Sequence, residues 1–83
     1  MYIGVRGENY TGLSILIDDR PLPGPYPAQI DRMAASLHKI QFRWAGGTLR
    51  GTEVAATVDL TGGRQFLIRA VPETSQVTLQ KMR

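Results

Sequence analysis

The chain has 83 residues, enough for one hydrophobic core and little more, so a single domain over residues 1–83 is expected. It contains no cysteine, which excludes disulfide bonds and thiolate metal sites and suits a reducing compartment. The net charge of +3 is the only compositional hint of a partner.

No targeting segment or membrane span is predicted. The N-terminal sequence Met-Tyr-Ile-Gly-Val-Arg is not a basic segment followed by an apolar run, as a signal peptide requires. No stretch approaches the roughly 18 apolar residues of a membrane-spanning helix. We therefore expect a cytoplasmic protein without membrane contact.

Two short runs, residues 3–5 and 13–17, carry apolar residues at every second position, as half-buried strands do. We predict a hairpin turned at residues 7–9, because the glycine and asparagine there tolerate left-handed backbone. Asp18-Asp19 would end the second strand. Residues 21–27 carry proline at every second position, which disfavours helix and sheet ladder alike and predicts an extended polyproline II connector.

Residues 27–39 are predicted to form one amphipathic helix. Pro27 suits the first helical position, and His38 and Lys39 lie in the last turn, where the helix dipole favours cations. Four apolar residues recur at helical spacing: Ile30, Met33, Ala34 and Leu37. This helix would cover one face of a sheet.

Residues 40–83 are predicted to form a four-stranded antiparallel meander, because loop lengths agree with the apolar alternation. A three-residue loop at residues 61–63 pairs Val58 with Phe66 on one apolar face. A two-residue loop would instead bury the guanidinium of Arg69. The next loop, Pro72-Glu73-Thr74-Ser75, sets a second register on the same face: Ala70 with Val77, Ile68 with Leu79 and Phe66 with Lys81.

The connection after Trp44 does not close as simply. A two-residue turn at Gly46-Gly47 would leave the apolar residues one position out of phase by Val54. One residue must be absorbed, either by a bulge at Gly51 or by a wide loop from Ala45 to Gly51, and we favour the bulge. The predicted order of elements is ββαββββ, an α+β fold with one helix on one face of an antiparallel sheet.

Candidate catalytic and metal-binding residues are few. His38 is the one histidine of the chain and is expected to be a solvated residue at the helix end rather than a general base. Asp18-Asp19 could in principle hold a divalent cation, but adjacent carboxylates at a strand end are typical of turns, and a cation needs more oxygen ligands. The sequence therefore predicts no enzyme, no catalytic or metal site and no cofactor.

The side of the predicted sheet that faces away from the helix carries a small apolar strip. Leu67 and Val71 flank Arg69 there, and Arg43 stands on the same side. Apolar residues ringed by arginine are typical of a modest protein interface. The leading hypothesis is a non-enzymatic interaction or assembly domain that contacts a protein partner, or a second copy of itself, through this open face or a sheet edge.

A weak, basic nucleic-acid-binding protein is the alternative. The excess of positive charge lies in residues 43–83, where four arginines could contact phosphate: Arg43, Arg50, Arg64 and Arg69. Single-strand binders also need exposed aromatic residues on which bases stack. On this register the aromatic residues of the meander, Phe42, Trp44 and Phe66, point to the helix side. The open face therefore has no aromatic residue on which a base could stack.

Overall fold

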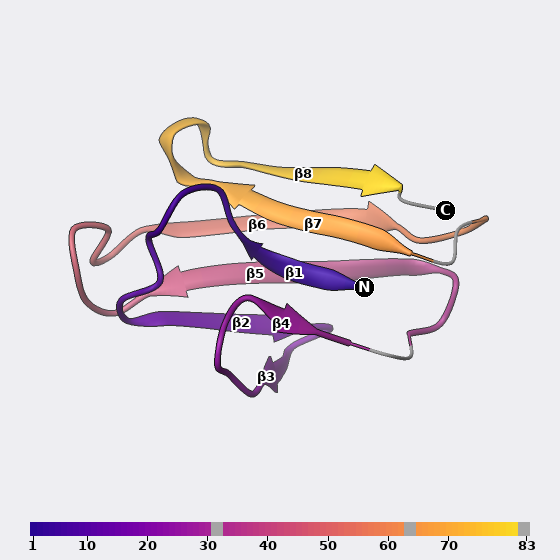
Figure 1. Cartoon of the computed structure of the whole chain (residues 1–83), viewed down its shortest axis with the longest axis horizontal. Helices are drawn as coiled ribbons and strands as arrows, with labels where there is room; N and C mark the ends of the chain where they lie inside the picture. The colour runs from indigo at the N-terminus through magenta and orange to yellow at the C-terminus, as the bar shows by residue number, and fades with distance from the viewer. Residues whose placement is uncertain (31–32, 63–64, 82–83) are drawn as a thin grey trace.

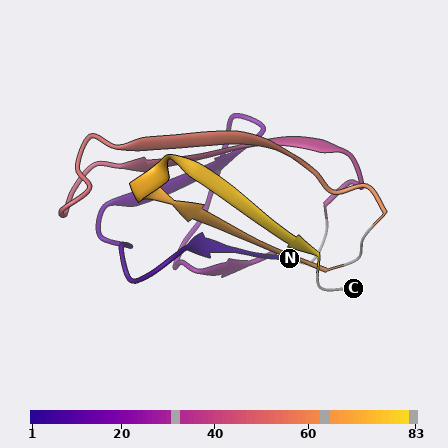
Figure 2. The ribbon, with the colours of Figure 1, turned by 90° about the horizontal axis from the view of Figure 1, so that it is seen from above.

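The computed structural model describes residues 1–30, 33–62 and 65–81, which form two four-stranded β-sheets packed face to face (Figures 1 and 2). Sheet A has the strand order β4-β1-β7-β8 and sheet B the order β3-β2-β5-β6. The strands of sheet A are β1 (Tyr2–Val5), β4 (Ala28–Gln29), β7 (Phe66–Val71) and β8 (Gln76–Lys81). Those of sheet B are β2 (Leu13–Ile17), β3 (Arg20–Leu22), β5 (Leu37–Trp44) and β6 (Glu53–Asp59).

The core lies between the two sheets and is filled by the inward residues of both. The predicted alternation is confirmed for seven residues of the C-terminal half, all of which are buried: Phe42, Trp44, Val54, Val58, Phe66, Ile68 and Ala70. What covers them differs from the prediction, because the second layer is the other sheet rather than a helix. The fold is a β-sandwich, and the predicted α+β fold of order ββαββββ is wrong.

The helix predicted for residues 27–39 is absent. This segment instead contains β4 and the first residues of β5, with residues 31–32 outside the described residues; the one helix described is the 3₁₀ turn η1 (Pro72–Thr74). From Leu37 onward the exposure alternates with period two except at the buried Gln41; Leu37, for example, is 66% exposed whereas His38 is buried. Strand β5 pairs with β6 over residues 37–43 and with β2 over residues 40–44, and this pairing overrides the weak helical spacing that precedes it.

Two predicted hairpins are also wrong. Strands β6 and β7 lie in different sheets, so Val58 does not pair with Phe66, although both point into the core. Of the predicted loop between them, Gly63 lies outside the described residues. Strand β1 does not pair with β2; it runs parallel to β7, with Ile3 opposite Ile68 (Figure 1).

The register predicted for the last hairpin is confirmed. Strands β7 and β8 are antiparallel, with Ala70 opposite Val77, Ile68 opposite Leu79 and Phe66 opposite Lys81. The four-residue connection consists of η1 and Ser75, whose φ of 53° reverses the chain.

Gly51 is a bulge residue at the end of a wide loop, so the structure combines both alternatives for this connection. Trp44 faces two residues, because its N–H donates to the Thr52 carbonyl at 3.0 Å and its carbonyl accepts from the Gly51 N–H at 2.9 Å. Gly51 has a φ of 83°, the left-handed conformation that glycine supplies in this type of bulge. The extra residue restores the phase, so that Phe42 pairs with Val54.

Asp18 and Asp19 form the two-residue turn of the β2–β3 hairpin, both with positive φ (52° and 65°). Asparagine and aspartate tolerate this conformation better than most residues. The polyproline II prediction is wrong for Pro21, which lies in β3 opposite Leu16. Because β3 is an edge strand, proline can occupy it without breaking a central ladder.

The side chain of Tyr10 closes the edge of β1 where β4 ends. Strand β4 pairs only with Tyr2 and Ile3. Two residues further along, the hydroxyl of Tyr10 accepts from the Val5 N–H at 3.2 Å and donates to the Val5 carbonyl at 3.1 Å. The phenol thus replaces a strand neighbour, as partly buried backbone groups require.

We predict that Tyr10→Phe lowers the free energy of unfolding by about 1–3 kcal/mol, because it leaves both polar groups of Val5 without their partner. Chemical denaturation measures this loss. Tyr2→Phe is the matched control, since Tyr2 is 49% exposed and its change should have little effect. Equal losses in the two variants would contradict the role assigned to Tyr10.

Candidate functional site

The outer face of sheet A carries a hollow where β1 and β7 lie side by side. Their parallel pairing sets Tyr2 beside Leu67 and Gly4 beside Arg69, so residues from the two ends of the chain share one surface. The hollow has a volume of about 340 Å³. We name this pocket the Arg6–Arg69 hollow. Its lining includes Tyr2, Arg6, Tyr10, Pro27, Leu67 and Arg69.

Gly4 lies at the base of the hollow and allows its neighbours to pack closely there. Its position on the outer side of β1 has no side chain, and Tyr10 and Pro27 lie over it. A Cβ atom at Gly4 would stand 2.9 Å from the Tyr10 hydroxyl oxygen and 3.0 Å from the Cβ of Pro27. The absence of a side chain therefore lets the ring of Tyr10 reach Val5, and the same close approach shapes one wall of the hollow.

The hollow is positively charged. Among the residues that the structure describes, Arg6 and Arg69 are the only charged ones that line it, and both are exposed. In the described part of the chain, neither arginine belongs to an ion pair. Unneutralised arginines next to tyrosine and leucine form a surface that attracts an anionic group and offers it apolar contact.

The predicted partner residues are divided between two faces of the molecule. Leu67 and Arg69 remain together in the hollow, with Leu67 half-buried. Val71, at the end of β7, is only 9% exposed and adds little surface to the strip. Arg43 lies in β5 of sheet B, where its Nε is 3.6 Å from the Glu53 carboxylate.

The predicted nucleic-acid set is not brought together by the described residues. Arg43 and Arg69 belong to different sheets, and Arg50 lies in the loop between β5 and β6. Arg64 is outside the described residues.

The sequence interpretation missed Tyr2, Arg6 and Tyr10, because it paired β1 with β2. The alternation of Tyr2 and Arg6 with the buried Ile3 and Val5 was the available signal.

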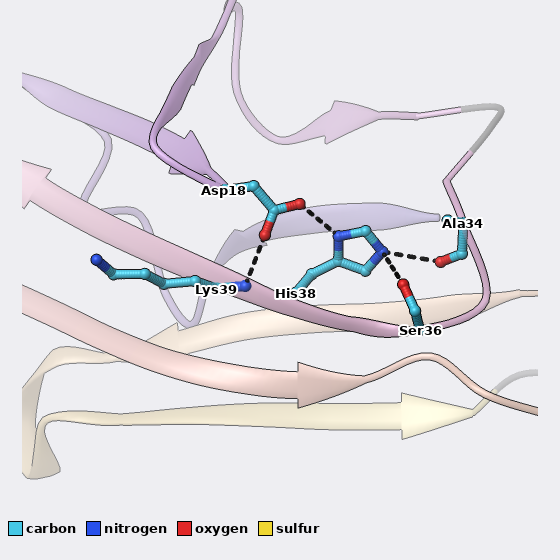
Figure 3. Close-up of polar contacts among 5 residues, drawn as sticks. All are labelled: Asp18, Ala34, Ser36, His38 and Lys39. Atoms are coloured by element: carbon cyan, nitrogen blue, oxygen red, sulfur yellow. Dashed lines mark hydrogen bonds and ion pairs between the residues drawn. The ribbon is translucent and has the colours of Figure 1, made fainter.

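A second polar cluster surrounds His38 (Figure 3). The prediction of a solvated helix-end residue is wrong, because His38 is 8% exposed and lies in β5. Its Nδ1 is 2.6 Å from the Asp18 carboxylate, and its Nε2 is 2.8 Å from the Ala34 carbonyl oxygen. The other carboxylate oxygen of Asp18 accepts from the Lys39 N–H at 3.0 Å.

Ser36 completes a serine–histidine–aspartate arrangement, with its Oγ 3.4 Å from Nε2 of His38 (Figure 3). A general base would need a lone pair on Nε2 to take the serine proton. The carbonyl of Ala34 is nearer to that nitrogen and can only accept, so Nε2 must donate to it. With Nδ1 directed at a carboxylate, both ring nitrogens face acceptors, and these contacts favour the double-donor imidazolium form.

The electrostatics follow from the same contacts. The hydrogen bond that His38 donates to the Asp18 carboxylate raises the pKa of His38, and the bond to the Ala34 carbonyl raises it further, against a smaller opposing effect of burial. The hydrogen bonds from His38 and from the Lys39 N–H lower the pKa of Asp18. Asp19, the neighbouring acid, instead lies 3.3 Å from Nζ of Lys39 on the surface.

Within residues 1–30, 33–62 and 65–81, no three histidine, cysteine or acidic side chains are grouped as a metal ion would require. The same residues contain no helix long and apolar enough to cross a membrane.

The chain matches no protein-family model, no curated protein and no solved structure. A functional proposal therefore has to rest on the geometry and charge of the molecule itself.

We predict that the His38–Asp18 pair makes stability depend on pH in two opposite directions. The pKa of His38 is raised by folding, so its contribution is complete below the ordinary value of 6.5 and is lost as pH rises through the folded value. The pKa of Asp18 is lowered, so its contribution is complete above 3.8 and is lost as pH falls through the folded value. These two groups should make the free energy of unfolding largest between about pH 4 and 6.5.

Denaturant unfolding across this pH range, with an NMR titration of the one histidine, measures both effects. Asp18→Asn should lower the pKa of His38 and flatten the alkaline fall in stability. Asp19→Asn is the control, because it keeps a residue that tolerates positive φ and leaves the His38 contacts in place. Identical His38 titrations in all three proteins would contradict the assignment.

Proposed function

We propose that the protein is a non-catalytic binding domain that docks an acidic segment of a protein partner on the Arg6–Arg69 hollow. The single observation behind this proposal is the pair of exposed arginines around a surface of tyrosine, proline and leucine, with no acidic residue among the described residues of the lining. We place this domain in the cytoplasm, a reducing compartment, because a chain without cysteine suits such an environment.

The composition of the hollow supports a protein partner. Tyrosine and arginine are enriched at protein interfaces and supply much of their binding energy. Tyr2 offers an exposed ring, and Leu67 next to it offers apolar area that a partner can cover. The two arginines would pair with carboxylates, which orient the partner and speed its approach.

The contrast between the two outer faces supports sheet A as the binding side. On sheet B, Arg43 is neutralised by Glu53 and Lys39 by Asp19. Such paired charges offer a partner little net field.

Nucleic-acid binding is a second candidate, favoured by one observation. Tyr2 is half exposed beside Leu67, one outward position before the Gly4–Arg69 pair, so sheet A has an exposed aromatic ring that the C-terminal strands alone do not supply. A base could stack on this ring while Arg6 and Arg69 contact phosphate. Two arginines would hold only a short stretch of backbone, which places this candidate second.

An NMR titration with two probes tests the proposal: an aspartate- and glutamate-rich peptide that contains leucine, and a single-stranded oligouridine. We expect the peptide to shift amide signals of β1 and β7. Arg6→Gln and Arg69→Gln should each weaken its binding about tenfold, since a charge-assisted hydrogen bond contributes roughly 1.5–3 kcal/mol.

Arg43→Gln is the matched control on the opposite face and should leave peptide binding unchanged. Binding of oligouridine alone, lost in Tyr2→Ala, would establish the second candidate instead. No shift at β1 and β7 with either probe, or equal weakening by Arg43→Gln, would overturn the hollow as the binding surface.

A further inference from the structure

The two sides of the sandwich protect their sheet edges very differently. On one side, β3 has three residues with Pro21 in the middle, and β4 has two. Near the ends of these short strands, tyrosine hydroxyls accept from backbone N–H groups of the neighbouring strand: Tyr10 from Val5, beyond β4, and Tyr26 from Ile15, opposite the last residue of β3. Proteins prevent edge-to-edge pairing by keeping edge strands short, by placing proline in them and by covering their free backbone groups.

The other side has none of these devices within the described residues. Strands β6 and β8 are seven and six residues long and contain neither proline nor glycine. In Figure 1, β8 (yellow) is the outermost strand of its sheet. Each of these strands therefore presents one row of unpaired backbone groups to a partner.

Side-chain exposure distinguishes the two edges. The inward residues Val54 and Val58 of β6 are already buried, so a new neighbour would gain little there. Leu79 of β8 lies opposite the buried Ile68, on the core side of sheet A, yet it is 38% exposed. A strand added beside β8 would cover this leucine and the half-buried Val77.

The sequence of β8 is self-complementary. Its first five residues, Gln76-Val77-Thr78-Leu79-Gln80, read as polar, apolar, polar, apolar, polar in both directions, and none is charged. Antiparallel pairing of two copies about Thr78 sets Val77 against Leu79 on the core side and Gln76 against Gln80 on the outer side. For β6, the full-length pairing about Ala56 would set Glu53 against Asp59 at both ends, which like charges disfavour.

We propose that the free edge of β8 binds β8 of a second copy of this chain, antiparallel and with Thr78 on the twofold axis. The two A sheets then form one continuous eight-stranded sheet. Because the axis is perpendicular to that sheet, both Arg6–Arg69 hollows face the same side. The two β7 strands lie three strand spacings apart, about 14 Å. This pairing does not require the acidic partner proposed above.

Pairing about Thr78 joins only residues 76–80 of each copy, an interface below the size of stable dimers, so the association is weak. Sedimentation equilibrium up to about 1 mM protein covers the range in which such pairs form. In a sample that mixes isotope-labelled and unlabelled chains, filtered NOEs should connect Val77 of one copy with Leu79 of the other.

Charge substitution at the axis gives a reciprocal test. Thr78→Lys and Thr78→Glu each place like charges opposite one another and should weaken self-association about fivefold or more. An equimolar mixture of the two variants should associate again, which also shows that both remain folded. Ala55→Lys adds the same charge to the outer side of β6 and should leave association unchanged.

A wild type that sediments as a monomer up to the highest concentration would overturn the proposal. So would filtered NOEs confined to other residues, equal weakening by Ala55→Lys, or failure of the Thr78 variants to associate when mixed. No acidic peptide is present in these experiments, so their failure would leave the function proposed for the hollow unaffected.

Discussion

The parallel pairing of β1 with β7 is the constraint on which the rest of the molecule depends. It inserts the N-terminal strand between β4 and β7, where Ile3 and Val5 become fully buried next to the inward residues of β7. The N-terminal amino group donates to the Ile30 carbonyl at 2.9 Å, and the Ile30 N–H returns a bond to Met1. Without β1, sheet A would keep only the β7–β8 hairpin, because β4 pairs with β1 alone, and two strands form a sheet of low stability.

Because β1 belongs to sheet A and β2 to sheet B, the chain must cross between the layers, and polar contacts hold these crossings in place. The indole N–H of Trp44 donates to the Asn9 carbonyl at 2.8 Å and fixes the β1–β2 connection. His38 fixes the β4–β5 connection through Ala34, while the Leu60 N–H donates to the Ser36 carbonyl. The His38 cluster therefore has a structural explanation that requires no catalytic role.

Local patterns in the sequence predicted faces well and strand partners poorly. Alternation identifies which residues point inward, and the short connection of residues 72–75 correctly set the β7–β8 register. A connection of similar length between β6 and β7 passes from one sheet to the other instead, and both strands show the same alternation in either arrangement. Burial of an apolar face does not specify whether a helix or a second sheet covers it. The helical spacing of residues 30–37 was a coincidence within a segment whose structure depends on pairing with distant strands.

The candidate surface was likewise predictable within one strand and not between strands. Leu67 and Arg69 could be found by counting along one strand, whereas Tyr2 and Arg6 required knowledge of a parallel partner about 65 residues away.

Interstrand NOEs from β1 test the account most directly, because the core, the hollow and the sandwich topology all require its position. The account predicts contacts between the backbones of Ile3 and Ile68 and of Gly4 and Arg69, in the pattern of parallel strands. Antiparallel contacts between residues 3–5 and residues 13–17, or contacts that pair Val58 with Phe66, would contradict it.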